Sequence, residues 1–290
     1  MSPGPRLQQG EAREQEELAS APYDRWLSPD GYTVAEFHRT PTGFLLRFPD
    51  RADFAIAADG SSATCHPVSD SDSKAIAALF ANSVAPVIGN HRGELNLHGS
   101  AVVVDGKALA FMGLSRRGKT TLAGAFAKAG FPFLTEDVLA LEPRDGGYLV
   151  APQAPGLRVF GDSAAWLLGV AAEAHPEDEK HELSSSAGLP SADKAVPLMA
   201  ICILGPGVAE SLQMTPLGEA AALAEVLRHG FILDVEDKAR LHAHFGRVAA
   251  LAGAVPCYRL DYPRRFDQLA GVVEAIADHF AESEAADGTD

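Results

Sequence analysis

Two patterns of hydrophobic and polar positions follow one another along the chain. From about residue 32 to residue 67, short apolar runs alternate with turn residues, and the clearest runs are Gly43–Phe48 and Ala52–Ala58. Asp59-Gly60 lies where a hairpin turn is expected, because Asp-Gly readily adopts the backbone angles of a two-residue turn. This pattern predicts a small β-rich N-terminal domain. A helical pattern over residues 73–89, ending near Pro86, links it to the rest of the chain.

Beyond residue 95 the pattern changes to alternating strands and helices. The segment LHGSAVVVDG predicts one strand, and KALAFMG after the Asp105-Gly106 turn predicts a second, continuously apolar as in strands buried on both faces. Lys119–Ala129 predicts a helix, and FPFLTEDVLAL after it predicts a further strand. The order strand, loop, helix, strand is that of the βαβ unit of an α/β domain.

The remaining segments complete the predicted domain plan. Leu198–Gly205 predicts a buried strand, and helices are expected near residues 216–228, 237–251 and 265–281. The polar residues 173–194 predict a mobile loop over the core. The expected divisions are a disordered tail over residues 1–20, a β-rich domain with its linking helix over 21–92, an α/β domain over 93–280 and an acidic disordered tail over 281–290.

Composition excludes several classes of protein. The formal net charge of -15 argues against a nucleic-acid partner, since affinity for a phosphate backbone depends on clustered Lys and Arg. The three cysteines, Cys65, Cys202 and Cys257, lie far apart and form no CxxC pair, which is typical of a reducing compartment. No apolar run approaches the ~20 residues that a membrane-spanning helix needs, and the polar N-terminus is no signal peptide. We expect a cytoplasmic protein without a membrane partner.

Residues 113–120 (GLSRRGKT) match the phosphate-loop motif G-x-x-x-x-G-K-[ST]. In such a loop the backbone N–H groups surround phosphate oxygens at the N-terminus of the following helix. The lysine then contacts the β- and γ-phosphates, and the hydroxyl residue after it ligates Mg²⁺. The expected nucleotide-binding residues are Gly113, Ser115, Arg116, Arg117, Gly118, Lys119, Thr120 and Thr121. The alternative is a chance glycine-containing turn with a solvated basic pair.

Two adjacent carboxylates, Glu136 and Asp137, follow the helix after this motif. If their strand is parallel to the strand before the motif and adjoins it, its carboxyl end delivers them to the same crevice. One carboxylate can ligate Mg²⁺ there, while the other accepts the proton of an acceptor hydroxyl. The alternative is a solvated turn. His98 begins an earlier strand, and a histidine in that place alone is more often structural than catalytic.

Together, Leu97-His98-Gly99-Ser100, the phosphate-loop motif and the acidic pair resemble the HPr serine kinase/phosphorylase family. The nearer likeness is to its shorter HPr-kinase-like relatives, some of which accompany lasso-peptide and related biosynthetic systems. In the family a His-Gly pair stands fifteen residues before the first loop glycine, and an Asp-Asp pair begins twenty-three residues after it. His98 and Glu136 have those two offsets from Gly113.

The resemblance implies an α/β fold with a P-loop kinase core of the HPr kinase and phosphoenolpyruvate carboxykinase type, in a family whose members often form homo-oligomers. By position, Lys119 matches the phosphate-binding lysine and Thr120 the magnesium-binding hydroxyl. Glu136 matches the Asp that activates the acceptor hydroxyl, Asp137 the metal-associated Asp, and His98 the active-site histidine. The implied catalytic residues are therefore Glu136, His98 and Lys119, with Thr120 and Asp137 as the metal ligands.

The chain departs from the family pattern at two places within the site. Glu136 is longer by one methylene than the family's Asp, which moves the carboxylate by ~1 Å. Arg116-Arg117 replaces a small, usually Gly-containing pair, and these arginines either contact phosphate or point to solvent. The longer segment that follows the core in the bifunctional enzymes has no good copy here, so a phosphorylase back-reaction is not expected.

These residues predict an ATP- and Mg²⁺-dependent kinase that transfers the γ-phosphoryl group to a hydroxyl. The expected acceptor is a serine of a peptide or small protein, for example a biosynthetic precursor peptide. Two alternatives stay open. One is a small-molecule hydroxyl kinase with acceptor specificity in residues 173–194, and the other is a nucleotide-binding regulatory module without phosphotransfer.

Overall fold

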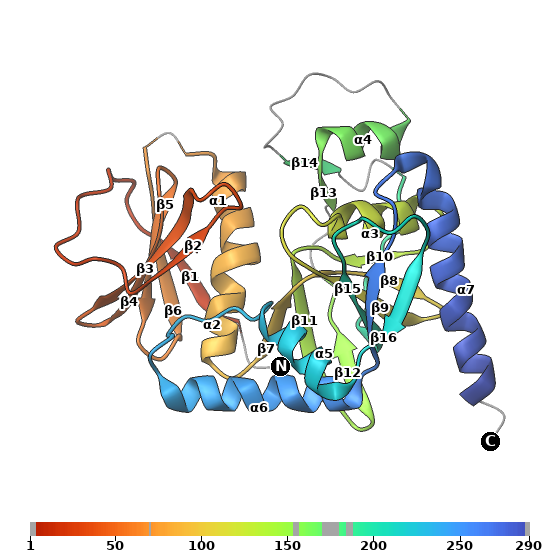
Figure 1. Ribbon diagram of the computed structural model, residues 1–290. Coiled ribbons are helices and arrows are strands. Elements are labelled where there is room, and N and C mark those ends of the chain that lie inside the picture. Colours follow the sequence, from red (N-terminus) through yellow and green to blue (C-terminus); the bar gives the residue numbers. More distant parts are fainter. Residues whose placement is uncertain (1–3, 70, 153–156, 170–179, 184–187, 288–290) are drawn as a thin grey trace. The chain divides into compact units, whose positions relative to one another are not determined.

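The computed structural model describes residues 4–69, 71–152, 157–169, 180–183 and 188–287, and the chain divides into two compact units (Figure 1). Unit 1 contains Met1–Asn96 together with Phe231–Gly246, and unit 2 contains Leu97–Gly230 together with Arg247–Asp290. The prediction had placed residues 231–246 in the second domain. A return of the chain to an earlier unit depends on contacts between distant residues, which the local hydrophobic pattern does not record.

Among the described residues, unit 1 contains a six-stranded sheet with the order β1-β6-β5-β4-β3-β2. Its strands are β1 (Arg6–Gln9), β2 (Asp24–Leu27), β3 (Thr33–Thr40), β4 (Gly43–Phe48), β5 (Ala52–Ala57) and β6 (Ser62–Pro67). The predicted turn at Asp59-Gly60 does join antiparallel β5 and β6. Strand β1 pairs in parallel with β6, although its residues were expected in a disordered tail. Hydrogen bonding to the edge of β6 orders this polar segment, because backbone groups pair whatever their side chains are.

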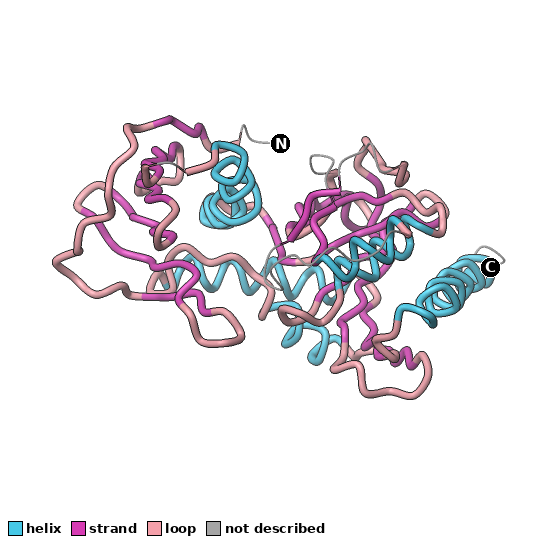
Figure 2. Tube along the Cα trace, turned by 90° about the horizontal axis from the view of Figure 1, so that it is seen from above, coloured by secondary structure: helices cyan, strands magenta, loops and turns pink. Residues whose placement is uncertain are grey.

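A continuous helical segment packs on one face of this sheet, and Figure 2 shows it from above. It consists of α1 (Ser73–Leu79), the π-helical turn η1 (Phe80–Val84) and α2 (Ala85–His91). The ring centroids of Phe54 and Phe80 lie 6.2 Å apart, and those of Phe44 and His91 lie 5.4 Å apart. The helix was expected to end near Pro86, but Pro86 lies in the first turn of α2. The π-helical turn before it changes the hydrogen-bond pattern, and a first-turn proline needs no N–H partner.

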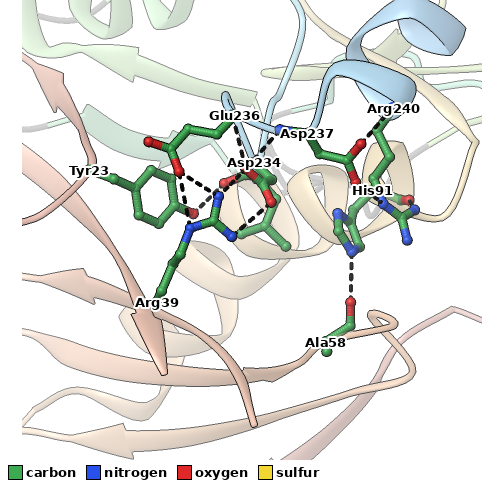
Figure 3. A network of polar contacts seen from close by, with 9 residues as sticks. Tyr23, Arg39, Ala58, His91, Asp234, Glu236, Asp237 and Arg240 are labelled. Carbon is green, nitrogen blue, oxygen red and sulfur yellow. Dashed lines mark hydrogen bonds and ion pairs between the residues drawn. The ribbon is translucent and has the colours of Figure 1, made fainter. Parts of the chain in front are cut away.

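The returning segment of unit 1 is tied to the sheet by a polar network around Arg39 (Figure 3). The guanidinium of Arg39 donates to both carboxylate oxygens of Asp234, at 3.0 and 2.6 Å, and to Glu236 at 2.9 Å. The hydroxyl of Tyr23 donates to the carbonyl of Leu233. Burial disfavours ionisation of Asp234, but hydrogen bonds from Arg39 and from two backbone N–H groups outweigh it, and the pKa of Asp234 is lowered. The network therefore depends on an ionised, nearly buried carboxylate.

The second sheet has nine strands within the described residues, seven of them on the path β10-β8-β9-β15-β12-β11-β7, with β17 beside β15 and β16 beside β17. These strands are β7 (Leu95–His98), β8 (Ser100–Val104), β9 (Lys107–Met112), β10 (Phe133–Thr135), β11 (Val138–Arg144), β12 (Gly147–Val150), β15 (Val196–Leu204), β16 (Gln213–Pro216) and β17 (Cys257–Asp261). Asp105 and Gly106, with φ of 47° and 77°, form the predicted tight turn between β8 and β9.

The neighbours of β9 differ from the prediction. Strand β9 pairs in parallel with β15 and antiparallel with β8, and β10 pairs with β8. The expectation that the strand before Glu136 adjoins the strand before the phosphate-loop motif is therefore wrong, since β8 lies between them. The predicted strand FPFLTEDVLAL is also broken, because Glu136 and Asp137 form a turn between β10 and β11. Local apolar pattern does not reveal which strands become neighbours.

The other elements of unit 2 surround this sheet. They are α3 (Lys119–Lys128), α4 (Gly161–Leu168), α5 (Glu219–Leu227), η3 (Phe266–Gln268), α7 (Leu269–Asp287) and the strand pair β13 (Leu157–Phe160) and β14 (Lys180–Leu183), while α6 (Lys238–Ala254) has residues in both units. The core brings together Phe111 of β9, Leu122 and Phe126 of α3, and Val273 and Ile276 of α7. Helices α3 and α7 thus pack on the same core, and α3 is held directly behind the loop that precedes it.

Two predicted irregular segments are partly structured. Of the loop expected over residues 173–194, residues 180–183 form β14, while 173–179 and 184–187 lie outside the described residues. Helix α7 continues to Asp287, into the acidic tail expected from residue 281. Its helical hydrogen bonds extend beyond the apolar pattern on which the boundary was based. Within the described ranges, no helix has the length and apolar content that crossing a bilayer requires.

Candidate functional site

The loop between β9 and α3 contains residues 113–118, and with the first two residues of α3 we call it the 113–120 loop. Gly118 precedes the helix with φ of 84°, a left-handed conformation that a Cβ would disfavour. Arg116 has φ of 61°, which is uncommon for a residue other than glycine. With Gly113, whose φ is 152°, the loop thus has three residues with positive φ before the helix starts. The predicted strand, loop and helix are all present.

The side chain of Lys119 folds back into this loop. Its ammonium donates to the carbonyl oxygen of Gly113 at 2.8 Å and to that of Leu114 at 3.2 Å, and the residue is 7% exposed. A buried ammonium needs such acceptors, because an unpaired charge is costly to desolvate. The loop thus surrounds a positive charge, as a site for an anionic ligand requires.

Glu136 reaches the 113–120 loop through Thr120. The Thr120 hydroxyl donates to Oε1 of Glu136 at 3.2 Å, and Glu136 is 7% exposed. The predicted meeting of a carboxylate with the hydroxyl residue of the motif is therefore present, although β10 is not the direct neighbour of β9. A hydroxyl and a carboxylate are hard oxygen donors of the type that Mg²⁺ prefers.

A tight turn at Asp137 brings the His98 strand end to the same place. Asp137 has φ of 63°, and the N–H of Val138 donates to the carbonyl of Glu136 at 2.7 Å. The carbonyl of Asp137 accepts the N–H of Gly99 at 3.3 Å. A Cβ on Gly99 would lie 2.9 Å from the backbone carbonyl oxygen of Phe111, so a side chain at this position would force the backbone to shift. The offsets seen in the sequence thus correspond to backbone proximity between residues 98–99 and 136–137.

A second histidine, His229, lies beside His98. The N–H of His98 donates to the carbonyl of His229 at 2.7 Å, and the adjacent residues Leu97 and Gly230 form an antiparallel bridge. Burial, together with the positive charges of His98, Lys119 and Arg228, lowers the pKa of His229 to about 4. Its ring is therefore neutral near pH 7. The sequence analysis missed this residue, because it lies more than a hundred positions from the motif.

Arg264 lies near Gly118 and was also missed. Its guanidinium donates to the carbonyl of Gly205 at 3.0 Å and lies 3.7 Å from the ring centroid of Tyr262. A Cβ on Gly118 would lie 3.9 Å from Cδ of Arg264. Burial raises the pKa of Tyr262 to about 12, so this ring stays neutral beneath the cation. The pair Arg264-Arg265 just after a strand was the available signal, but nothing local links it to the loop.

The other predicted nucleotide-binding residues divide into exposed and paired side chains. Ser115 and Arg116 are exposed, and Arg117 is half-buried. The hydroxyl of Thr121 lies 3.0 Å from that of Ser163 on α4, so its side chain faces that helix. Any contact of Thr121 with a nucleotide is therefore expected from its backbone N–H.

Of the predicted metal ligands, Thr120 donates its hydroxyl to the Glu136 carboxylate, and Asp137 follows Glu136 in the turn, where its backbone carbonyl accepts the N–H of Gly99. Within the part of the chain that the structure describes, no three His, Cys, Asp or Glu side chains form a cluster that could hold a metal ion. Mg²⁺ in phosphoryl-transfer sites takes one or two protein ligands and completes its shell with phosphates and water. Thr120, whose hydroxyl bonds to the Glu136 carboxylate, fits a magnesium site that phosphates and water complete. It does not fit a site in which protein side chains supply all the ligands.

Comparison with solved structures gives a distant structural relationship. No protein-family model matches the chain, and no curated protein matches it. The chain is similar in structure to the Hpr(Ser) kinase/phosphatase from Coxiella burnetii, with a TM-score of 0.38 and 10% sequence identity. The alignment covers 67% of this chain and 96% of the other. This is a distant structural relationship only.

Proposed function

We propose that this protein is an ATP- and Mg²⁺-dependent kinase that phosphorylates a hydroxyl, with a serine of a peptide or small protein as acceptor. The observation that supports it best is the 3.2 Å hydrogen bond from the Thr120 hydroxyl to Glu136. It holds a carboxylate at the residue of the 113–120 loop where a magnesium-bound phosphate group would lie. Phosphoryl transfer needs these three parts together, namely a phosphate loop, a metal ligand and a base.

The roles follow from the chemistry of each side chain. Lys119 exchanges its two carbonyl partners for the β- and γ-phosphates, and Glu136 accepts the proton of the acceptor hydroxyl. As the new O–P bond forms, the bond from the γ-phosphorus to the bridging oxygen breaks, and ADP leaves. A bound Mg²⁺, held by Thr120 and Asp137, would neutralise charge on the β- and γ-phosphates. His98 orients the acceptor or the phosphoryl group.

The test is transfer from labelled ATP to serine peptides, measured beside nucleotide binding. Glu136→Gln is expected to bind nucleotide but to transfer phosphate roughly 10² to 10⁴ times more slowly. Glu142→Gln is the matched control, because Glu142 is a partly exposed carboxylate paired with Arg144. Lys119→Met is expected to weaken nucleotide binding about 10- to 100-fold, the effect of losing charged hydrogen bonds.

Four outcomes separate the proposal from its rivals. Transfer to peptides that is lost in Glu136→Gln and kept in Glu142→Gln supports the proposed kinase. Transfer only to small hydroxyl compounds would indicate a small-molecule kinase on the same site. Tight binding with no transfer to any acceptor would indicate a regulatory module, and no nucleotide binding would refute the assignment of the 113–120 loop.

A further inference from the structure

Three parallel strands of unit 2, β9, β15 and β17, end at the same edge of the sheet. Strand β15 pairs in parallel with β9 through residues 198–203 and with β17 through residues 201–204, so it lies between them. The carboxyl ends of these strands lead into the 113–120 loop, residues 205–209 and residues 262–265. Ligands of open α/β sheets bind at the carboxyl ends of neighbouring parallel strands. The last two segments therefore border a ligand of the 113–120 loop.

Two glycines of the 113–120 loop lie close to these segments. A Cβ on Gly113 would lie 3.1 Å from Cβ of Leu204, the last residue of β15. A Cβ on Gly118 would lie 3.8 Å from Oη of Tyr262, 3.9 Å from Cδ of Arg264 and 4.0 Å from its Nε. The side chain of Arg264 thus passes the N-cap residue of α3, where backbone N–H groups and the helix dipole attract anions.

Contacts within unit 2 hold the guanidinium of Arg264 in place. Its Nη2 donates to the carbonyl of Gly205 at 3.0 Å, and its Cζ lies 3.7 Å from the ring centroid of Tyr262. Nη2 also lies 3.8 Å from Oδ1 of Asp261, which accepts the N–H of Gly207 at 2.6 Å. The side chain of Arg264 is 26% exposed. Because a guanidinium has five N–H donors, these contacts leave donors for a ligand that reaches its exposed part.

The position of Arg264 relative to Glu136 indicates which part of a nucleotide it would meet. Along the sheet the order is β10-β8-β9-β15, and β17 lies beyond β15, so the Glu136 turn and Arg264 follow strands on opposite sides of β9. The proposed transfer takes place beside Glu136, where the γ-phosphate would lie. The side of the 113–120 loop that faces Arg264 is then left for the phosphates nearer the nucleoside.

We propose that Arg264 binds the nucleotide by donating to its α- and β-phosphates, the part that ATP and ADP share. This inference rests on the nucleotide-binding part of the proposed function. A planar, permanently charged guanidinium matches phosphate oxygens, and its stacking on Tyr262 reduces the freedom that binding has to remove. A contact that is equally strong before and during transfer increases affinity and does not increase the rate of the chemical step.

The experiment measures displacement of a fluorescent ATP analogue by ATP, by ADP and by inorganic tripolyphosphate, which has no nucleoside. Arg264→Gln keeps an N–H donor for the Gly205 carbonyl and removes the charge, whereas Arg264→Lys keeps the charge without the planar fork. Arg265→Gln is the matched control, since the neighbouring Arg265 is exposed and pairs with Asp267 at 2.9 Å. Thermal unfolding and kcat at saturating ATP are measured for each variant.

Arg264→Gln is expected to weaken binding of all three ligands about 10- to 100-fold, the effect of losing hydrogen bonds between charged groups. Its kcat at saturating ATP should stay near the wild-type value. Arg264→Lys should recover part of the affinity, and Arg265→Gln should bind like the wild type.

Several results would overturn the inference. One is wild-type affinity in a folded Arg264→Gln variant. Another is weaker binding of ATP with unchanged binding of ADP, which would place Arg264 at the γ-phosphate. Weaker binding of both nucleotides with unchanged binding of tripolyphosphate would place it at the nucleoside. If Arg264→Gln does not fold, Arg264→Met replaces it, and unfolding of both variants would mark Arg264 as structural.

Failure of the proposed kinase looks different. A wild-type protein that binds nucleotide but transfers no phosphate would refute the kinase, and the role of Arg264 would still be decided by the binding measurements. A wild-type protein that transfers phosphate and is indifferent to Arg264→Gln would keep the kinase and reject only the role of this arginine. A wild-type protein that binds none of the three ligands would refute both.

Discussion

The hydroxyl of Thr120, in the first turn of α3, donates to the carboxylate of Glu136 at the turn between β10 and β11. This contact joins two segments that lie sixteen residues apart and belong to different elements. In the absence of a cation, a hydroxyl and a carboxylate in this arrangement satisfy each other. With Mg²⁺ and nucleotide present, both oxygens become available to the metal shell and to the acceptor proton.

Thr120→Val tests the metal role of this hydroxyl. The substitution keeps the shape and removes the oxygen, so Mg²⁺ should no longer strengthen nucleotide binding, whereas Thr120→Ser should behave like the wild type. Nucleotide titrations with and without Mg²⁺ measure the effect. Thr215→Val, at an exposed position on β16, is the control. An undiminished effect of Mg²⁺ on Thr120→Val would show that the hydroxyl is not a ligand.

Arg116→Gly tests the backbone of the 113–120 loop. Arg116 has φ of 61°, and a side chain in this left-handed region costs about 1–2 kcal/mol. Part of the gain from glycine is offset by its greater freedom in the unfolded chain, so the free energy of unfolding should rise by about 0.5–1 kcal/mol. Denaturant titration measures it. The neighbouring change Arg117→Gly is the control, and it should lower stability, because φ of Arg117 is not positive.

Asp234→Asn tests the polar network of unit 1 through its dependence on pH. The folded-state pKa of Asp234 is lowered, so its contribution to stability is present above the unfolded pKa of about 4 and is lost as pH falls through the folded value. At pH 7 the variant should be less stable by roughly 1–3 kcal/mol, because hydrogen bonds to a charged group are lost. The difference in the free energy of unfolding between variant and wild type should become smaller as the pH falls below 4. A difference that stays constant with pH would contradict an ionised Asp234 in the folded protein.

The three cysteines should not react with thiol reagents in the folded protein. Cys65, Cys202 and Cys257 are buried free thiols, and burial raises the pKa of each, that of Cys257 to about 11. Since the thiolate is the reactive form, a thiol reagent at pH 8 should modify none of them in native protein and all three after unfolding. Rapid modification of a native cysteine would show that its surroundings open.

Local pattern predicted the parts of the site that local chemistry determines. The run Lys119–Ala129 was expected to be a helix, and α3 spans Lys119–Lys128. Glu136 was also expected to lie near the loop, and its carboxylate does accept the Thr120 hydroxyl, although the strand before it adjoins β8 and not β9 as expected. The roles of these residues in catalysis stay predictions until transfer is measured.

The parts that were missed depend on pairing between distant segments. Nothing near His229 or Arg264 in the sequence indicates that they approach His98 and Gly118, and the position of β8 between β9 and β10 was equally hidden. An apolar run indicates that a strand is buried, but it does not indicate which strands lie beside it. Several strand orders in a sheet bury the same apolar positions. Residues 231–246 illustrate the same limit, since their acidic and apolar positions would suit either unit.

Unit 1 is built from Met1–Asn96 and Phe231–Gly246, so it cannot complete its folding until late in synthesis. During synthesis the sheet emerges first, but Arg39 has no Asp234 to bind until almost the entire polypeptide has left the ribosome. A fragment ending near residue 96 would therefore leave Arg39 without the carboxylates of Asp234 and Glu236. Expression of unit 1 alone must therefore join these two stretches, because a single cut in the gene cannot separate the units.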